Sequence, residues 1–175
     1  MKRYLFILSA LFLILPGCTK VEKTRTSGID TIDNTQYFST AYYYYGFTFS
    51  SAKLVATYPA PGPDITVYIN SDSIPSRLTL QASNLKPSFF KVGDYVDEEA
   101  AKSAFNDLKS FSADQWLDMA DPINENQIWI FRTGRDTYAK VRIISIVNEI
   151  RETLPYGECK FEWVYQSDGS LTFPK

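Results

Sequence analysis

Residues 127–143, Gln-Ile-Trp-Ile-Phe-Arg-Thr-Gly-Arg-Asp-Thr-Tyr-Ala-Lys-Val-Arg-Ile, decide the fold of this chain. Residues 127–131 are apolar on both faces of an extended chain, which predicts a strand in the middle of a sheet. Residues 133–136 form a glycine-containing turn, and apolar alternation then runs back over residues 138–150. The segment therefore predicts an antiparallel hairpin. The side chains expected to share one face of its second strand are Ala139, Val141, Ile143, Ser145 and Val147.

Further strands are expected on both sides of this hairpin. Downstream, a Pro-Tyr-Gly turn at 155–157 leads into a strand at 159–166. Upstream, apolar and polar residues alternate over four stretches, at residues 47–50, 54–58, 65–70 and 78–82.

The middle of the chain has helical spacing instead. Asp97 is a plausible N-cap, and Glu98 and Glu99 follow it where the helix dipole favours carboxylates. The apolar positions that recur at three- and four-residue spacing are Ala101, Ala104, Phe105, Leu108 and Phe111. A capping-box pattern at residues 112–115 predicts a second short helix that carries Trp116, Leu117 and Ala120. The fold class is therefore α+β, predominantly antiparallel β of meander or sandwich-like form, with a short helical insertion around residues 97–120.

The N-terminal segment has the layout of a bacterial lipoprotein signal. Lys2 and Arg3 precede an apolar run at residues 4–15, and Gly17 and Cys18 close it. The run is shorter than the about 20 residues that a transmembrane helix needs. We expect residues 1–17 to be a cleaved signal peptide and Cys18 to carry the lipid. Residues 18–36 would form the anchor and a flexible tether, and residues 37–175 a single β-rich domain.

Composition excludes several classes of function. The formal net charge is −2 and no basic run interleaves with aromatic residues, so no nucleic-acid partner is expected. Histidine is absent, which removes the Ser-His-Asp, Cys-His and His-zinc arrangements, and we predict no enzymatic activity. Cys159 is expected to be a small buried core residue, with a reactive thiol as the alternative. Residues 121–126 are rich in oxygen-bearing side chains but lack EF-hand spacing, which favours a solvated loop.

The run Tyr42-Tyr43-Tyr44-Tyr45 contains the candidate ligand-binding residues. In one strand, Tyr42 and Tyr44 would face one way, and Tyr43 and Tyr45 the other, so that two rings stay accessible. Such rings suit stacking against a porphyrin, a sugar or a partner protein. The alternative is a sheet that uses tyrosine both in its core and at its rim.

The C-terminal third resembles the HmuY family of bacterial haem-binding lipoproteins. Residues 128–143, followed by Phe-Glu-Trp-Val-Tyr-Gln-Ser-Asp-Gly-Ser at 161–170, are similar to a hairpin and a strand-turn of that family. The clearest matches are Tyr-Ala-Lys at 138–140 and Tyr-Gln-Ser-Asp-Gly at 165–169. The resemblance implies a mostly antiparallel β-fold on an outer-membrane lipoprotein. Residues 19–23 lack an acidic cluster, so display on the periplasmic or on the outer face stays open.

The resemblance also implies haem capture, yet the expected ligands are missing. Haemophores of that family hold iron through a pair of His or a pair of Met side chains. This chain has no His, and Met119 would be its one Met after leader cleavage. Met119 and the tyrosines are the remaining candidates for haem, because Tyr can ligate haem iron. Two functions are therefore expected: an envelope protein that captures haem or another small ligand for an outer-membrane receptor, or a structural or interaction lipoprotein that kept the fold without haem.

Overall fold

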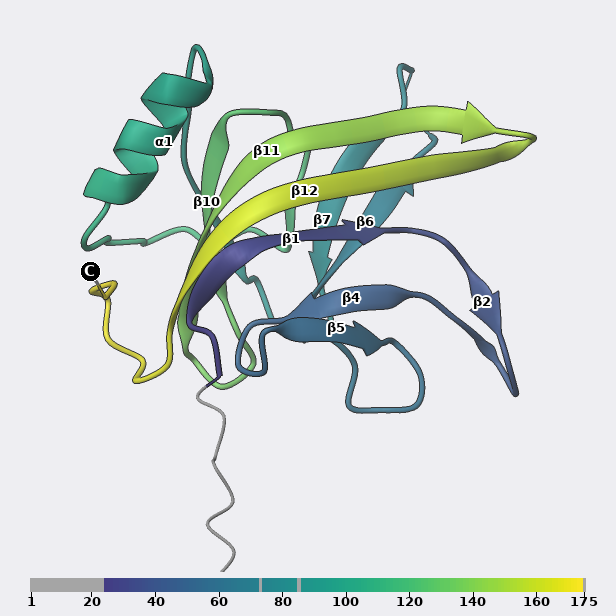
Figure 1. Ribbon diagram of the computed structural model, residues 1–175, viewed down its shortest axis with the longest axis horizontal. Helices are drawn as coiled ribbons and strands as arrows, with labels where there is room; N and C mark the ends of the chain where they lie inside the picture. Colours follow the sequence, from purple (N-terminus) through teal and green to yellow (C-terminus); the bar gives the residue numbers. More distant parts are fainter. Residues whose placement is uncertain (1–23, 73, 85, 175) are drawn as a thin grey trace, which may run out of the picture.

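The computed structural model describes residues 24–174 except 73 and 85, and these residues form a sandwich of two packed antiparallel sheets, each with five strands. The first sheet has the order β1 (Ser27–Asp33), β12 (Leu154–Gln166), β11 (Tyr138–Arg151), β10 (Gln127–Arg132) and β8 (Phe89–Asp94). The second has the order β5 (Lys53–Ala56), β4 (Tyr45–Thr48), β6 (Ile65–Asn70), β7 (Arg77–Ala82) and β9 (Met119–Ala120). The helix α1 (Glu98–Asp107) flanks the first sheet, and β2 (Tyr37–Phe38) and β3 (Tyr42–Tyr43) form a small separate hairpin (Figure 1). The predicted α+β class dominated by antiparallel strands is confirmed.

The predicted central strand is β10, which pairs with β11 on one side and β8 on the other. Its two faces bury different neighbours. Trp129 and Phe131 belong to the core between the sheets, whereas Ile128 and Ile130 lie on the face that α1 covers. All four side chains are almost fully buried. Burial on both faces explains why this strand has no polar alternation.

The β11–β12 hairpin contains a β-bulge, which the apolar alternation did not predict. Pairing passes from Ile143↔Phe161 directly to Ser145↔Lys160, so one residue is inserted on β11. A bulge of this kind reverses the inward and outward alternation beyond it. Ile146, opposite Cys159, therefore packs against the core where Ser145 and Val147 were expected.

The predicted tether of residues 18–36 is wrong for its second half, because Ser27–Asp33 is β1 and pairs along its whole length with β12. Ile32 is buried in the core, and the Asp30 carboxylate accepts a 2.7 Å hydrogen bond from Nε1 of Trp163. An edge strand with one solvated face can be mostly polar, which hid it from the hydrophobic pattern. The predicted signal peptide and Cys18 lie outside the described residues.

The first predicted helix is confirmed and the second is wrong. Asp97 caps α1, accepting a 2.8 Å hydrogen bond from the Ala100 amide. The segment beyond it is extended: Leu117 exchanges backbone hydrogen bonds with Phe89, and β9 pairs with β7. A helix of one or two turns satisfies few backbone groups, whereas a neighbouring strand edge satisfies them in register. The segment therefore joins the sheets.

Candidate functional site

The tyrosine run does not form one strand, because it spans two elements. Tyr42 and Tyr43 form β3 and pair with Phe38 and Tyr37 of β2, while Tyr45 begins β4 in the second sheet. Tyr44 lies at the junction, half-buried; its amide donates to Oγ1 of Thr57 at 3.2 Å, and its carbonyl accepts from the Thr57 amide at 2.9 Å. Tyr44 thus holds the hairpin to the sandwich, while Tyr42 and Tyr45 are exposed and Tyr43 is half-buried.

Five rings lie on this hairpin and at the start of β4, in two groups on opposite faces of the hairpin, and we call Tyr37, Phe38, Tyr42, Tyr43 and Tyr45 together the aromatic surface. Tyr37 stacks on Tyr43 with ring centroids 5.6 Å apart, and both meet Tyr45 edge-on at 5.5 and 5.7 Å. Tyr43 and Tyr45 therefore share a face, as predicted. Phe38 packs on Tyr42 at 5.0 Å, and these two rings are 67% and 73% exposed. The rings are thus ordered by one another and still open to a partner.

The aromatic surface carries no acidic or basic side chain, only the rings of Tyr and Phe. Desolvation, together with the adjacent Tyr45, raises the pKa of Tyr43 above the ordinary value for tyrosine. Its hydroxyl therefore remains protonated and able to donate and accept hydrogen bonds. Neutral rings with polar tips suit an amphipathic partner better than a strongly charged one.

Met119 does not join the tyrosines. It lies in strand β9, not in a helix, and pairs with Gln81 of β7. Its side chain is 37% exposed. The strands β6 and β7 separate β9 from β4, and three strand spacings amount to about 14 Å. Met119 and Tyr45 are thus on strands that do not pair, and neither of the two pockets described below is lined by Met119 or by a residue of the tyrosine run, so the structure does not assemble a haem pocket from them.

Two residues of the aromatic surface, Tyr37 and Phe38, are not among the residues that the sequence pattern singles out. They directly follow the predicted tether, and nothing in the pattern connects them with the tyrosine run. A signal is nevertheless present, because two aromatic pairs, Tyr37-Phe38 and Tyr42-Tyr43, flank a Ser-Thr-Ala turn. Aromatic residues directly opposite each other on neighbouring strands are a common cross-strand pairing.

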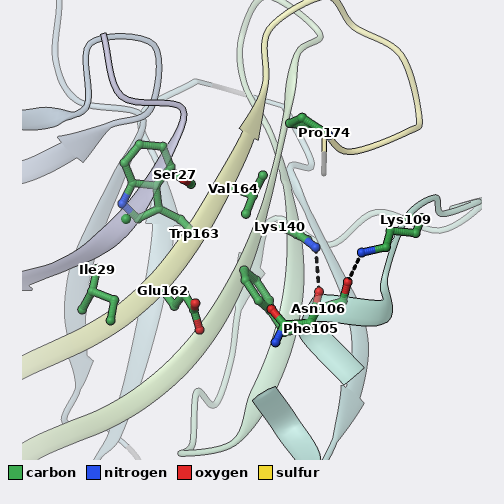
Figure 2. Close-up of a pocket in the computed structure, with 11 residues that line it drawn as sticks. Ser27, Ile29, Phe105, Asn106, Lys109, Lys140, Glu162, Trp163, Val164 and Pro174 are labelled. Carbon is green, nitrogen blue, oxygen red and sulfur yellow. Dashed lines mark hydrogen bonds between the residues drawn. The ribbon is translucent and has the colours of Figure 1, made fainter. Parts of the chain in front are cut away.

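A surface pocket of about 520 Å³ lies between α1, β1 and β12 (Figure 2). Its chemistry centres on Lys140, whose side chain is almost fully buried. The ammonium donates to the carbonyls of Phe105 at 2.6 Å and Leu108 at 3.0 Å, at the C-terminal end of α1. A cation at this end of a helix satisfies unpaired carbonyls and the helix dipole. Lys140 thus has the geometry of a helix cap, and two of its three donors are used by backbone carbonyls.

The charge of Lys140 predicts a pH dependence of stability. Burial, and then the nearby charge of Lys109, lower the pKa of Lys140 to about 8, against about 10.4 in an unfolded chain. Glu162 and Asp107 oppose this shift. Between these two pKa values the unfolded state binds more protons, so stability rises with pH. We expect this rise in urea unfolding of the wild type at pH 7.5, 9 and 10.5, and a smaller rise in Lys140→Met. An equal change of the free energy of unfolding with pH in the two proteins would contradict a lowered pKa of Lys140 in the folded state.

The structure also places Cys159 and residues 121–126, the remaining candidates from the sequence. Cys159 is fully buried in the core, as expected, and burial raises the pKa of its thiol far above the ordinary value. In the described part of the chain, no group of three or more His, Cys, Asp or Glu residues could hold a metal ion, residues 121–126 included. Within the same residues no helix is long and apolar enough to cross a membrane.

Comparison with known proteins identifies no relative of this chain. No family model, no curated protein and no solved structure matches this chain. What the chain binds must therefore be inferred from the aromatic surface and from the geometry of the pockets.

Proposed function

We propose that this chain is a lipid-anchored binding protein of the bacterial cell envelope, HmuY-like in type, that contacts a protein partner through the aromatic surface. One observation carries the proposal: Phe38 and Tyr42 are mostly exposed, although they are packed against each other. Because these rings face solvent on a hairpin outside the two large sheets, they do not contribute to the hydrophobic core. Contiguous exposed aromatic groups commonly mark interaction sites.

The arrangement of the aromatic surface suits recognition of a protein. Tyrosine is enriched among the residues that dominate binding energy, because one ring offers a large apolar face and one hydroxyl. The rings already pack in pairs, so little side-chain freedom remains to be lost on binding. The hairpin lies at the opposite end of the molecule from α1 (Figure 1). The residues Tyr37, Phe38, Tyr42 and Tyr45 are exposed. We propose a binding role, not a catalytic one.

The anchor is a further element of the proposal, and it rests on the sequence. Lipidation at Cys18 would place the domain beside the membrane, since two or more acyl chains hold a protein stably there. Residues 19–26 precede β1, and a fully extended chain of eight residues reaches at most about 28 Å. The domain, and with it the aromatic surface, would thus work close to the outer membrane.

Haem is not the ligand that we propose. The family resemblance suggests it, but Met119 lies in β9 at one edge of the second sheet, whereas the tyrosine run lies in β3 and β4, and β6 and β7 separate β4 from β9. The aromatic surface is also a projecting hairpin. A porphyrin would be better served by a concave, mostly apolar site. A protein partner is therefore the better-supported ligand for these five rings.

The double variant Phe38→Ser with Tyr42→Ser tests the proposal. Because both rings are exposed, we expect the free energy of unfolding to change by less than about 1 kcal/mol. Formaldehyde cross-linking in intact cells should give a discrete adduct with the wild type and lose it with the variant. Leu54→Ser with Tyr68→Ser is the matched control, since both side chains are about half exposed and lie elsewhere on the second sheet. Equal loss of the adduct in both pairs would refute a specific role.

A further inference from the structure

A second pocket, of about 600 Å³, lies at the end of the sandwich and is separate from the aromatic surface. Four connections from distant parts of the chain line it: the β4–β5 turn, the β5–β6 loop, the segment after β7 and the β10–β11 turn. Its size falls in the range of small-molecule sites. Nothing in the proposed function uses this pocket.

The wall of this pocket is rich in groups that both donate and accept hydrogen bonds. Its hydroxyl and amide side chains are Thr48, Ser50, Ser51, Ser83, Asn84, Thr133 and Tyr165. Hydrogen bonds hold the Tyr165 side chain in position. Its hydroxyl lies 2.9 Å from Oγ1 of Thr137, and Oγ1 of Thr137 lies 2.7 Å from Oγ1 of Thr133. Asn84, Thr133 and Tyr165 already hydrogen-bond within the protein. The side chains of Thr48, Ser50, Ser51 and Ser83 form no hydrogen bond within the described residues, and a ligand that carries several hydroxyl groups of its own is their complement.

Asp64 narrows the class of ligand further. Its Oδ2 accepts a 2.8 Å hydrogen bond from the Phe49 amide, whereas Oδ1 accepts none within the described residues. Burial raises the pKa of this carboxyl above its ordinary value, and the charge of Arg135 opposes the rise. An ionised carboxylate only accepts hydrogen bonds. It therefore favours a ligand that donates O–H groups.

Two cations at the same pocket indicate that the ligand also carries an anionic group. Lys53 and Arg135 line the pocket, are exposed, and form no ion pair with any residue that the structure describes. Charge-assisted bonds to a carboxylate are stronger than those between neutral groups. Val55, Pro61 and Pro63 supply apolar contacts for a ring.

We propose that this pocket binds an acidic saccharide, one that contains a uronic acid, with Asp64 accepting from sugar hydroxyls and Arg135 and Lys53 holding the sugar carboxylate. A neutral sugar would satisfy the hydroxyl wall, but it would leave Lys53 without an anionic partner and Arg135 with only the charge of Asp64. A free carboxylic acid or phosphate would leave the hydroxyl wall and Asp64 unmatched. A uronic acid matches the hydroxyl wall and Asp64 through its hydroxyl groups, and the two cations through its carboxylate.

Isothermal titration of the wild-type protein with cellobiouronic acid and with cellobiose tests this assignment, because the two disaccharides differ at one carboxylate. We expect saturable binding of the acid that is about tenfold tighter than that of the neutral sugar. Arg135→Gln should abolish this preference. Asp64→Asn should weaken both sugars, while the amide oxygen preserves the bond from the Phe49 amide. Lys102→Gln, which removes an exposed charge on α1, is the charge-matched control and should change neither affinity.

Three results would overturn the assignment. The first is no saturable heat with either disaccharide. The second is equal affinity for the acid and the neutral sugar. The third is inorganic phosphate displacing the acid as well as the acid displaces itself, which would show a general anion site. A loss of the cellular adduct in Phe38→Ser with Tyr42→Ser bears on the aromatic surface alone, so the two proposals fail independently.

Discussion

Replacing Trp163 with alanine is expected to lower the free energy of unfolding by about 3–5 kcal/mol. Its ring is fully buried between the sheets, 5.2 Å from the ring of Phe47 and 5.8 Å from that of Phe49. Its Nε1 also donates to Asp30 at 2.7 Å, which ties β1 to the core. The substitution would therefore leave a cavity and release the edge strand together.

Urea unfolding measures this loss, and two further variants separate its contributions. Trp163→Phe keeps most of the packing and loses the bond to Asp30, so its cost should fall between those of the wild type and the alanine variant. Trp116→Ala removes a half-buried ring that belongs to the segment after α1 and packs on Phe111, and it should cost less than Trp163→Ala. If Trp163→Ala stayed within about 1 kcal/mol of the wild type, the two sheets would not share the core described here.

Gly46→Ala is expected to destabilise the protein by about 2–3 kcal/mol. A Cβ at Gly46 would overlap the carbonyl oxygen of Ile65 and lie 2.6 Å from Cγ of Pro63. The first of these atoms belongs to the backbone of β6, where β4 pairs through Phe47 and Ile65. The strands would have to separate locally, because a backbone carbonyl cannot rotate away as a side chain can.

Gly62→Ala is the matched control for this experiment. At Gly62 the nearest atom to a new Cβ is 3.7 Å away, an ordinary contact, and the residue is exposed. Its stability should stay within about 0.5 kcal/mol of the wild type in the same urea series. Equal effects of the two substitutions would mean that the close approach of β4 to β6 is not what restricts Gly46.

The elements with strong periodicity could be predicted from the sequence, and the elements held by pairing alone could not. The β10–β11 hairpin and α1 are predictable because apolar spacing and a capping aspartate are local signals. The strand β1 is not, because an edge strand needs only Ile32 in the core. The sequence around Met119 predicts a helix because the strand that pairs with it instead, β7, is far away in the sequence.

The candidate site was predictable only as a set of residue types. The tyrosine run marked the aromatic surface, but the break at Tyr44 depends on its two bonds with Thr57, thirteen residues away. No pattern in the sequence indicated the pocket at the end of the sandwich. It assembles Asp64, Asn84 and Arg135 from three loops, and only the packing of the two sheets brings those loops to one end.

The most direct test of the central claim is site-specific photo-cross-linking from position 42 in the full-length protein in intact cells. A benzophenone side chain in place of Tyr42 should give one discrete adduct with a protein partner. The same group in place of Val96, which is 91% exposed in the segment before α1, should not give that adduct. A role of the aromatic surface in binding predicts the adduct at position 42 alone. An identical adduct from both positions, or none from position 42, would contradict it.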